Sequence, residues 1–212
     1  MEKWKIFVII FLLGGLVGLG AVQSRLSNAP ATPPAGEQPR KEAPLPIMQL
    51  MGKSAPAWNI PIKYWMNTKT PLDVSDSKGN LTLVEFFRIE CSHCQDAVPF
   101  MKHLQKTYGP KGLKIVAIQS PGQAPTENDW KTVQDKVREW QLTYPVAFDE
   151  QGQLFKTKYN GTNYPTLLLI DPNGMIRFVQ TGHTAEKAAQ LESVIKAGLQ
   201  MTSGAPGARS GG

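Results

Sequence analysis

Cysteine and histidine, the usual ligands of structural zinc, are scarce: the 212 residues include two cysteines and three histidines. A structural zinc site usually takes four nitrogen or sulfur ligands. Cys91, Cys94 and His93 supply three, while His103 and His183 lie far away in the sequence. We therefore expect no metal site, and we interpret His103 and His183 as surface or packing residues without a functional role.

A concentrated run of positive charge is also missing. The chain carries a formal net charge of +6 at pH 7, but its lysines and arginines are dispersed. Nucleic-acid-binding proteins gather basic side chains on one face or along one stretch, with aromatic residues among them in many cases. The dispersed charge therefore predicts a solvated surface and no nucleic-acid partner.

The two cysteines are nevertheless placed together, in the segment Cys91-Ser92-His93-Cys94. Residues three apart lie on the same face of a helix, near enough for a disulfide of ordinary dimensions to form and break without moving the backbone. A purely structural disulfide across so short a loop would remove little chain entropy and would stabilise little. The spacing therefore favours a redox-active pair.

The segment before the pair indicates how its two sulfurs differ. Residues 81–87 form an apolar run typical of a strand covered on both faces, and a short turn leads from it to a helix that starts at Cys91. The N–H groups and the dipole at a helix start favour an anion, and therefore a thiolate on Cys91. Cys94 lies one turn deeper and loses that benefit. We predict that Cys91 is the nucleophile and Cys94 the resolving partner.

Residues 1–25 differ in kind from the rest. Lysines precede an uncharged stretch from Ile6 to Val22. At ~1.5 Å per residue this stretch covers most of a ~30 Å hydrocarbon layer, so it is a membrane anchor or a signal peptide. We favour an uncleaved, single-pass anchor in the inner (cytoplasmic) membrane. The lysines then leave the N-terminus in the cytoplasm, and the remaining chain is periplasmic or otherwise extracytoplasmic.

The composition divides the remaining chain into three parts. Six prolines fall between Ala29 and Pro46, so residues 26–49 are predicted to form an extended, semi-rigid linker. Residues 201–212 are small, polar and Gly-rich, which is typical of a disordered tail. A folded domain is expected at residues 50–200, which is long enough to bury a core.

Strand and helix patterns alternate within that domain. Strands are expected at 58–62, 64–66, 81–87, 113–118, 144–148, 166–170 and 175–180, and helices after Cys91, after a cap at Thr126, at 151–159 and after a cap at Thr184. The last strand follows a tight turn and returns antiparallel. This order predicts an α/β domain with a central mixed sheet flanked by helices.

With these features in register, residues 55–199 resemble the thioredoxin fold, and more closely its exported TlpA/ResA-like thiol-disulfide oxidoreductases. The likeness rests on the buried strand, the C-x-x-C at a helix start, Pro99 five residues after the second cysteine, and the segment 159–166 that leads into an apolar strand. The helix and strand between Thr126 and Phe148 resemble the central insertion of the TlpA branch. The resemblance implies disulfide exchange with protein substrates, with a redox-active disulfide between Cys91 and Cys94 and no other cofactor.

The resemblance also gives meaning to two residues outside the pair. Glu85 stands six residues before Cys91, where thioredoxins keep a buried acid. A carboxylate in an apolar strand is costly unless its pKa rises and it exchanges protons, which suits proton transfer with Cys94; the alternative is that Glu85 faces solvent. Pro165 falls at the family's cis-proline, and its implied role is to present the backbone of Tyr164 to an extended substrate segment.

Close to the pair, the sequence departs from the family pattern. Glu90 stands where tryptophan is usual and would oppose a thiolate, whereas Arg88 and a charged His93 would favour it. We therefore treat Ser92, His93 and Glu90 as tuning positions. Because a histidine before the second cysteine also occurs in strongly oxidising DsbA-type sites, reductant and oxidant features are mixed.

Our leading hypothesis is a membrane-anchored reductase of the cytochrome c maturation type, recycled by a membrane electron-transfer partner. One alternative is a disulfide-forming oxidase with the same chemistry. Another is a Cu(I)-handling chaperone that uses the thiols and a histidine, although copper chaperones of this fold space their cysteines more widely and add a downstream histidine. A further alternative, which is neither an oxidoreductase nor a copper chaperone, is a tethered binding domain whose disulfide takes part in no exchange reaction. The single-cysteine motif of peroxiredoxins is absent.

Overall fold

The computed structural model describes residues 46–122 and 129–203. The predicted anchor at 1–25 lies outside these residues, as do residues 26–45 of the predicted linker and residues 204–212 of the predicted tail. Among the helices that the structure describes, none combines the length and apolarity needed to cross a bilayer. At the end of the predicted linker, the short 3₁₀ helix η1 (Ile47–Leu50) is formed, and Ile47 is buried.

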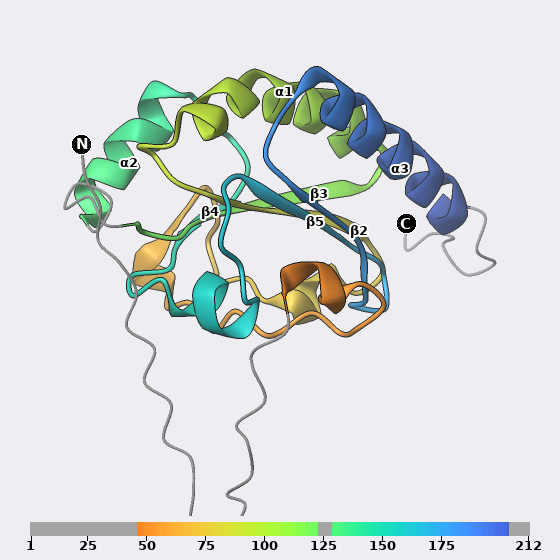
Figure 1. The fold of residues 1–212 in the computed structure, drawn as a ribbon, viewed down its shortest axis with the longest axis horizontal. Coiled ribbons are helices and arrows are strands. Elements are labelled where there is room, and N and C mark those ends of the chain that lie inside the picture. Colours follow the sequence, from red (N-terminus) through yellow and green to blue (C-terminus); the bar gives the residue numbers. More distant parts are fainter. Residues whose placement is uncertain (1–45, 123–128, 204–212) are drawn as a thin grey trace, which may run out of the picture. The chain divides into compact units, whose positions relative to one another are not determined.

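The described residues form an α/β domain around one six-stranded mixed sheet (Figure 1), which confirms the predicted fold class. The strand order is β1-β4-β3-β2-β5-β6. The central strand β2 runs parallel to β3 and antiparallel to β5, and β1 and β6 pair antiparallel at the two edges. The strands are β1 (Trp65–Met66), β2 (Leu81–Phe87), β3 (Leu113–Gln119), β4 (Val146–Phe148), β5 (Thr166–Ile170) and β6 (Ile176–Thr181).

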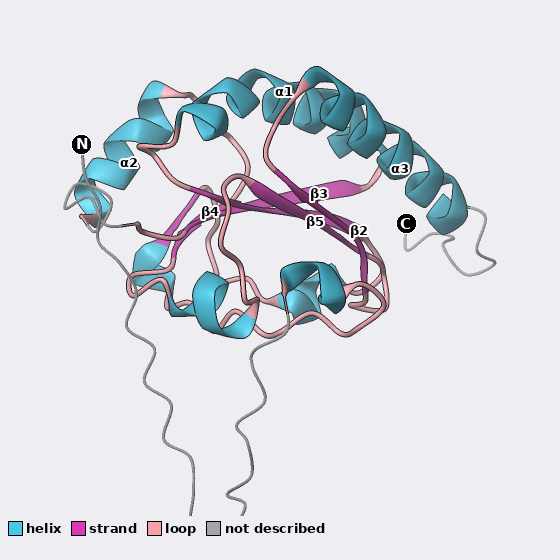
Figure 2. Cartoon of the chain, in the orientation of Figure 1, coloured by secondary structure: helices cyan, strands magenta, loops and turns pink. Residues whose placement is uncertain are grey.

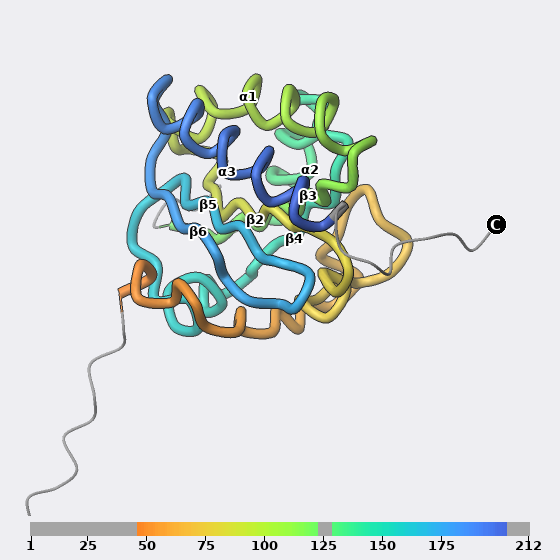
Figure 3. Tube along the Cα trace, turned by 90° about the vertical axis from the view of Figure 1, so that its right-hand side faces the viewer, coloured from red at the N-terminus to blue at the C-terminus, as the bar shows by residue number. Residues whose placement is uncertain are grey.

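Helices cover both faces of this sheet (Figure 2). The long helices α1 (Ser92–Tyr108), α2 (Trp130–Glu139) and α3 (Ala185–Ser203) lie on one face. The N-terminal segment and the short helices lie on the other, as the turned view shows (Figure 3). These short helices include η1, η2 (Ile62–Tyr64), η3 (Val74–Ser77) and the π-helix η6 (Leu154–Lys158), whereas η4 (Gly109–Lys111) follows α1 directly.

The strand β2 is buried along its whole length because both faces of the sheet are covered. Side chains of a strand alternate between faces. Leu83 and Phe87 belong to the apolar cluster under the long helices, whereas Val84 and Phe86 belong to the cluster on the opposite side. The same alternation places Glu85 on the side of the long helices, beneath the first turn of α1.

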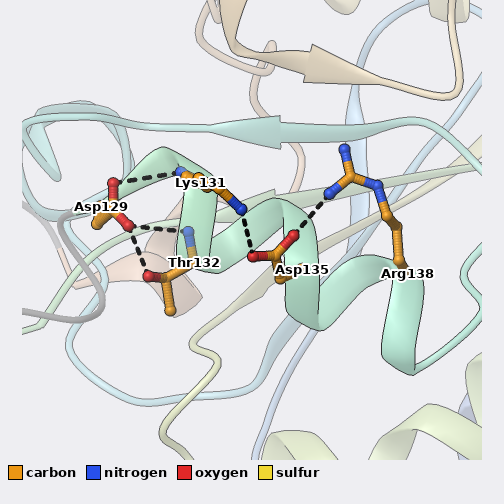
Figure 4. A network of polar contacts seen from close by, with 5 residues as sticks. All are labelled: Asp129, Lys131, Thr132, Asp135 and Arg138. Atoms are coloured by element: carbon orange, nitrogen blue, oxygen red, sulfur yellow. Dashed lines mark hydrogen bonds and ion pairs between the residues drawn. The ribbon is translucent and has the colours of Figure 1, made fainter.

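Two helix caps set where α2 and α3 begin. The Asp129 carboxylate accepts hydrogen bonds from the N–H groups of Lys131 and Thr132 at the start of α2 (Figure 4), an arrangement that satisfies donors left open at a helix start. The predicted cap Thr126 lies outside the described residues. For α3, the Thr184 hydroxyl accepts from the N–H of Lys187 at 3.3 Å, as predicted.

The predicted strand at residues 58–62 is wrong. Asn59 has a positive φ of 53°, which interrupts extended pairing, and Pro61 lacks the N–H that a ladder needs. Trp58 and Ile60 are buried without forming a strand. The expected strand 64–66 is reduced to the two residues of β1, and within 151–159 the chain forms the π-helix η6.

Candidate active site

Cys91 is the N-cap residue of α1, at the position predicted for it. Its Sγ accepts a hydrogen bond from the N–H of Cys94 at 3.4 Å, and an N–H donor of this kind stabilises negative charge on the sulfur. On its other side, Sγ lies 3.8 Å from the carbonyl oxygen of Tyr164. The side chain is partly exposed and the thiol is free, so Cys91 is the sulfur that a substrate can reach.

Cys94 lies one turn deeper and is only 1% exposed. It is a free thiol packed in the apolar cluster between the sheet and the long helices. Burial is the main cause that raises the pKa of this thiol, and the hydrogen bond with Cys91 and the charge of Glu85 add to the effect. The two sulfurs are therefore unequal: one is accessible at a helix start, and the other is sealed and holds its proton.

Glu85 is 5% exposed, so the alternative of a solvated side chain does not apply. Burial raises its pKa to about 8, because an apolar environment disfavours the charged carboxylate. Its charge also acts on the nearby Tyr144, whose pKa is raised by burial first and by Glu85 second. A carboxyl with this pKa is mostly protonated at neutral pH and can release or take up a proton there.

Two glutamines that the sequence did not single out fix the turn before Cys91. The N–H of Ile89 donates to Oε1 of Gln119 at the end of β3, at 3.0 Å. The carbonyl of Ile89 accepts from Nε2 of Gln95 on α1, also at 3.0 Å. Both backbone groups of a fully buried residue are thus satisfied. The only signal in the sequence was a polar residue at the end of the buried strand β3.

The segment opposite the cysteines is shaped by a cis peptide bond between Tyr164 and Pro165. The Tyr164 ring packs against Phe155, with ring centroids 4.7 Å apart, and the Arg88 guanidinium lies 5.5 Å from the centre of the same ring. The carbonyl of Pro165 accepts from the N–H of Gly182 at 2.7 Å. These contacts hold the Tyr164 backbone beside Cys91.

The three residues predicted to tune the pair, Ser92, His93 and Glu90, are all exposed around the first turn of α1. Their roles stay predictions. The structure also brings His183 from the loop after β6 into electrostatic reach of His93, although ninety residues separate them in the sequence. In the described ranges, no three side chains of histidine, cysteine, aspartate or glutamate are grouped as a metal would require.

With this geometry in place, comparison with known proteins identifies the family. The model of the AhpC/TSA family matches residues 51–179. The chain belongs to the AhpC/TSA family. The matched range contains β2, both cysteines and the Tyr164-Pro165 segment, whereas Gly182 and His183 lie beyond it.

Two curated relatives align with most of this chain and with most of their own length. The thioredoxin-like protein YneN of Bacillus subtilis is 25% identical over 88% of this chain and 94% of its own length. The thiol-disulfide oxidoreductase ResA of Bacillus cereus is 29% identical over 89% of this chain and 92% of its own. A solved structure described as the thiol:disulfide interchange protein DsbE of Chlorobium tepidum superposes with a TM-score of 0.61 and 26% identity, covering 70% of this chain and 97% of that protein.

These similarities confirm the thioredoxin-like fold and the relationship to ResA-like thiol-disulfide oxidoreductases that the sequence predicted. The chain is thus an AhpC/TSA-family member of the thiol-disulfide oxidoreductase kind.

Proposed function

We propose that this protein exchanges disulfides with protein substrates through Cys91 and Cys94, acting as a reductase outside the cytoplasm. The observation that carries the proposal is the inequality of the two sulfurs. Cys91 is partly exposed and accepts an N–H at a helix start, whereas Cys94 is buried and its thiol pKa is raised. Thiol–disulfide exchange needs one accessible attacking sulfur and a second one held beside it.

The first step is attack by the Cys91 thiolate on a substrate disulfide. A mixed disulfide forms between Cys91 and one substrate sulfur, and the other substrate sulfur leaves as a thiolate that takes up a proton. Cys94 then loses its proton and attacks the Cys91 sulfur. This forms the Cys91–Cys94 disulfide and releases the second substrate sulfur as a thiolate, which takes up a proton from solvent. Two electrons have passed from the dithiol to the substrate.

Glu85 provides the proton acceptor for the second step. The Cys94 thiol is buried and holds its proton tightly, so it needs a base within the protein. In its ionised form Glu85 is a carboxylate in the same buried layer, with a pKa of about 8 that suits proton exchange near neutral pH. The proton passes from the Cys94 sulfur to the Glu85 carboxylate as the new disulfide forms.

The backbone at Tyr164 and Pro165 provides the docking surface for the substrate. The Tyr164 carbonyl lies 3.8 Å from the attacking sulfur, so a segment lying along it in extended form has its own cysteine next to Cys91. Recognition through backbone groups of this kind is used widely for extended peptides.

The finer assignment is a role in cytochrome c maturation, with electrons supplied by a membrane partner and the domain held by residues 1–25 as an anchor. It is supported by the apolar N-terminal stretch and by similarity to proteins named ResA and DsbE.

The exposed His93 between the cysteines favours the opposite direction of the reaction, the oxidation of substrate thiols. The reduction potential of the pair separates the two: near or below about −270 mV for a reductant, near about −120 mV for an oxidant.

The decisive experiment for the chemistry is trapping. In a Cys94→Ala variant, Cys91 can attack a substrate but the mixed disulfide is not resolved, so covalent adducts accumulate on non-reducing gels. In the matched Cys91→Ala variant no adducts are expected, because Cys94 is buried. Adducts in neither variant, or equal amounts in both, would contradict the proposed roles.

A further inference from the structure

All three histidines of the chain lie along one face of α1. His93 is in the first turn, and His103 lies further along, where its ring stacks on Phe100 with centroids 6.5 Å apart. His183 lies in the loop between β6 and α3, and its ring packs on the same Phe100 ring, with centroids 5.6 Å apart. The sequence indicated no such proximity, because the contact depends on the path of the chain after β6.

Of these histidines, His183 is the one joined to the substrate-docking segment. Its neighbour Gly182 donates its N–H to the carbonyl of Pro165 at 2.7 Å. The preceding residue, Tyr164, holds its carbonyl 3.8 Å from the Cys91 sulfur. Contacts to the backbone of Tyr164 and Pro165 therefore connect the reactive sulfur with Gly182, the residue before His183.

The surroundings of the ring fix its chemical form. Nδ1 of His183 is buried and has no hydrogen-bond partner among the described residues. Either tautomer leaves Nδ1 without a partner, but a buried N–H without an acceptor is the rarer case in folded proteins, so we assign the proton of the neutral ring to Nε2. Nε2 is not buried in this way, and it therefore presents an N–H donor on the outer side of the ring.

The charges around His183 also determine which kind of hydrogen-bond acceptor can bind to its ring. Burial lowers its pKa and a charged His93 lowers it further, while Asp96 on α1 opposes both effects. From α3, the Lys187 ammonium lies beside the neighbouring Gly182. The ring is thus neutral at neutral pH, and the Asp96 carboxylate and the Lys187 ammonium near it have opposite charges. With little net charge around it, the site is suited to a neutral oxygen acceptor.

We propose that His183 is a positioning residue: its Nε2–H donates a hydrogen bond to a main-chain or amide oxygen of the substrate segment that docks at Tyr164 and Pro165. This inference rests on the proposed function and adds the group that recognises the substrate on the side away from Cys91. Because the acceptor belongs to the peptide backbone or an amide, the contact favours polypeptide disulfides over small disulfides.

Two full-length variants and two substrates test the inference. His183→Phe keeps a ring against Phe100 but removes the donor, whereas His183→Gln keeps a neutral N–H donor at a similar reach. The substrates are a cyclic peptide closed by one disulfide, and 4,4′-dithiodipyridine, which has no amide oxygen. We divide kcat/KM for the cyclic peptide by kcat/KM for 4,4′-dithiodipyridine. This ratio should fall about three- to tenfold in His183→Phe, which is the cost of one neutral hydrogen bond. The fall should come mainly from a higher KM for the peptide. His183→Gln should restore the ratio.

His103→Phe is the matched control. This histidine also stacks on Phe100, but its Nε2 contacts Glu192 on α3, and neither contact involves the docking segment. The ratio should therefore equal that of the unchanged protein. An unchanged ratio in His183→Phe, an equal fall in His103→Phe, or failure of His183→Gln to restore the ratio would overturn the inference.

The same measurements separate this inference from the proposed function. If the unchanged protein reduces neither substrate, the proposed reductase chemistry fails. If it reduces both and the three variants show the same ratio, only the role of His183 fails.

Discussion

Glu85 and Cys94 share one buried layer between β2 and the first turn of α1. Each is almost fully inaccessible. Burial first, with the charge of Glu85 among the further causes, raises the pKa of the Cys94 thiol. Two buried acids within electrostatic reach cannot both ionise cheaply, so the loss of a proton by one is coupled to the state of the other.

This relationship makes the stability of the reduced protein depend on pH. The pKa of Glu85 is 4.5 in the absence of burial and about 8 in the fold. Between these values the unfolded chain loses the proton and the folded chain keeps it, so the free energy of unfolding falls as pH rises from about 4.5 to 8. Glu85→Gln should remove this fall and be the more stable protein at pH 8, by up to about 5 kcal/mol.

Urea denaturation of the reduced proteins at several pH values measures this effect. Glu139→Gln, which changes an exposed carboxylate on α2, is the control and should keep the pH dependence of the unchanged protein. Parallel pH profiles for Glu85→Gln and the unchanged protein would contradict a buried, protonated Glu85.

The same substitution should slow the second chemical step. Without a carboxylate, Cys94 loses its internal base, so the mixed disulfide at Cys91 should resolve about 100-fold more slowly, the lower end of what a positioned acid or base contributes. The lifetime of a mixed disulfide with a fluorescent thiol measures this step directly. Resolution at the original rate would exclude Glu85 as the proton acceptor.

Gln119 should be important although it touches neither sulfur. Gln119→Ala leaves the buried N–H of Ile89 without its acceptor, and an unsatisfied buried donor costs about 1–3 kcal/mol. We expect that loss in the free energy of unfolding, together with altered alkylation of Cys91 by iodoacetamide. Gln190→Ala, on the exposed surface of α3, should change neither quantity. Equal stability of the two variants would show that the contact is not needed.

Gly161 should not tolerate a side chain. A Cβ at this position would lie 2.0 Å from the Phe155 ring, and Phe155 in turn supports the ring of Tyr164. Gly161→Ala should destabilise the fold by about 1–3 kcal/mol and raise KM for protein substrates. Gly109→Ala is the control, because its Cβ would meet nothing closer than 3.5 Å. Thermal unfolding that shifts equally in both variants would contradict the role of the Phe155 contact.

The sequence predicted the parts of this protein that local patterns determine. The apolar run of β2 indicated a strand buried on both sides, and the spacing of Cys91 and Cys94 placed them on one turn at a helix start. The family resemblance then located Glu85 and Pro165. Each of these inferences depends on residues that are close in sequence or that follow a pattern shared with known proteins.

The parts that were missed depend on contacts between distant segments. Gln119 meets Ile89 only because β3 pairs with β2 in a particular register, and His183 meets Phe100 only because the fold brings the loop after β6 next to α1. The strand expected at 58–62 failed for a local reason that hydrophobicity alone does not reveal. There, the left-handed backbone of Asn59 and the missing N–H of Pro61 outweigh the apolar pattern.

The two glutamine contacts on Ile89 have a consequence for electron transfer. Because Gln119 and Gln95 hold both backbone groups of this residue, the chain that carries the reactive sulfur is anchored to the sheet and to the helix independently of any bond between the sulfurs. The oxidised and reduced enzymes should therefore share nearly the same backbone. Reorganisation of the protein then contributes little to the free energy of the redox reaction. That free energy depends mainly on which sulfur carries the negative charge.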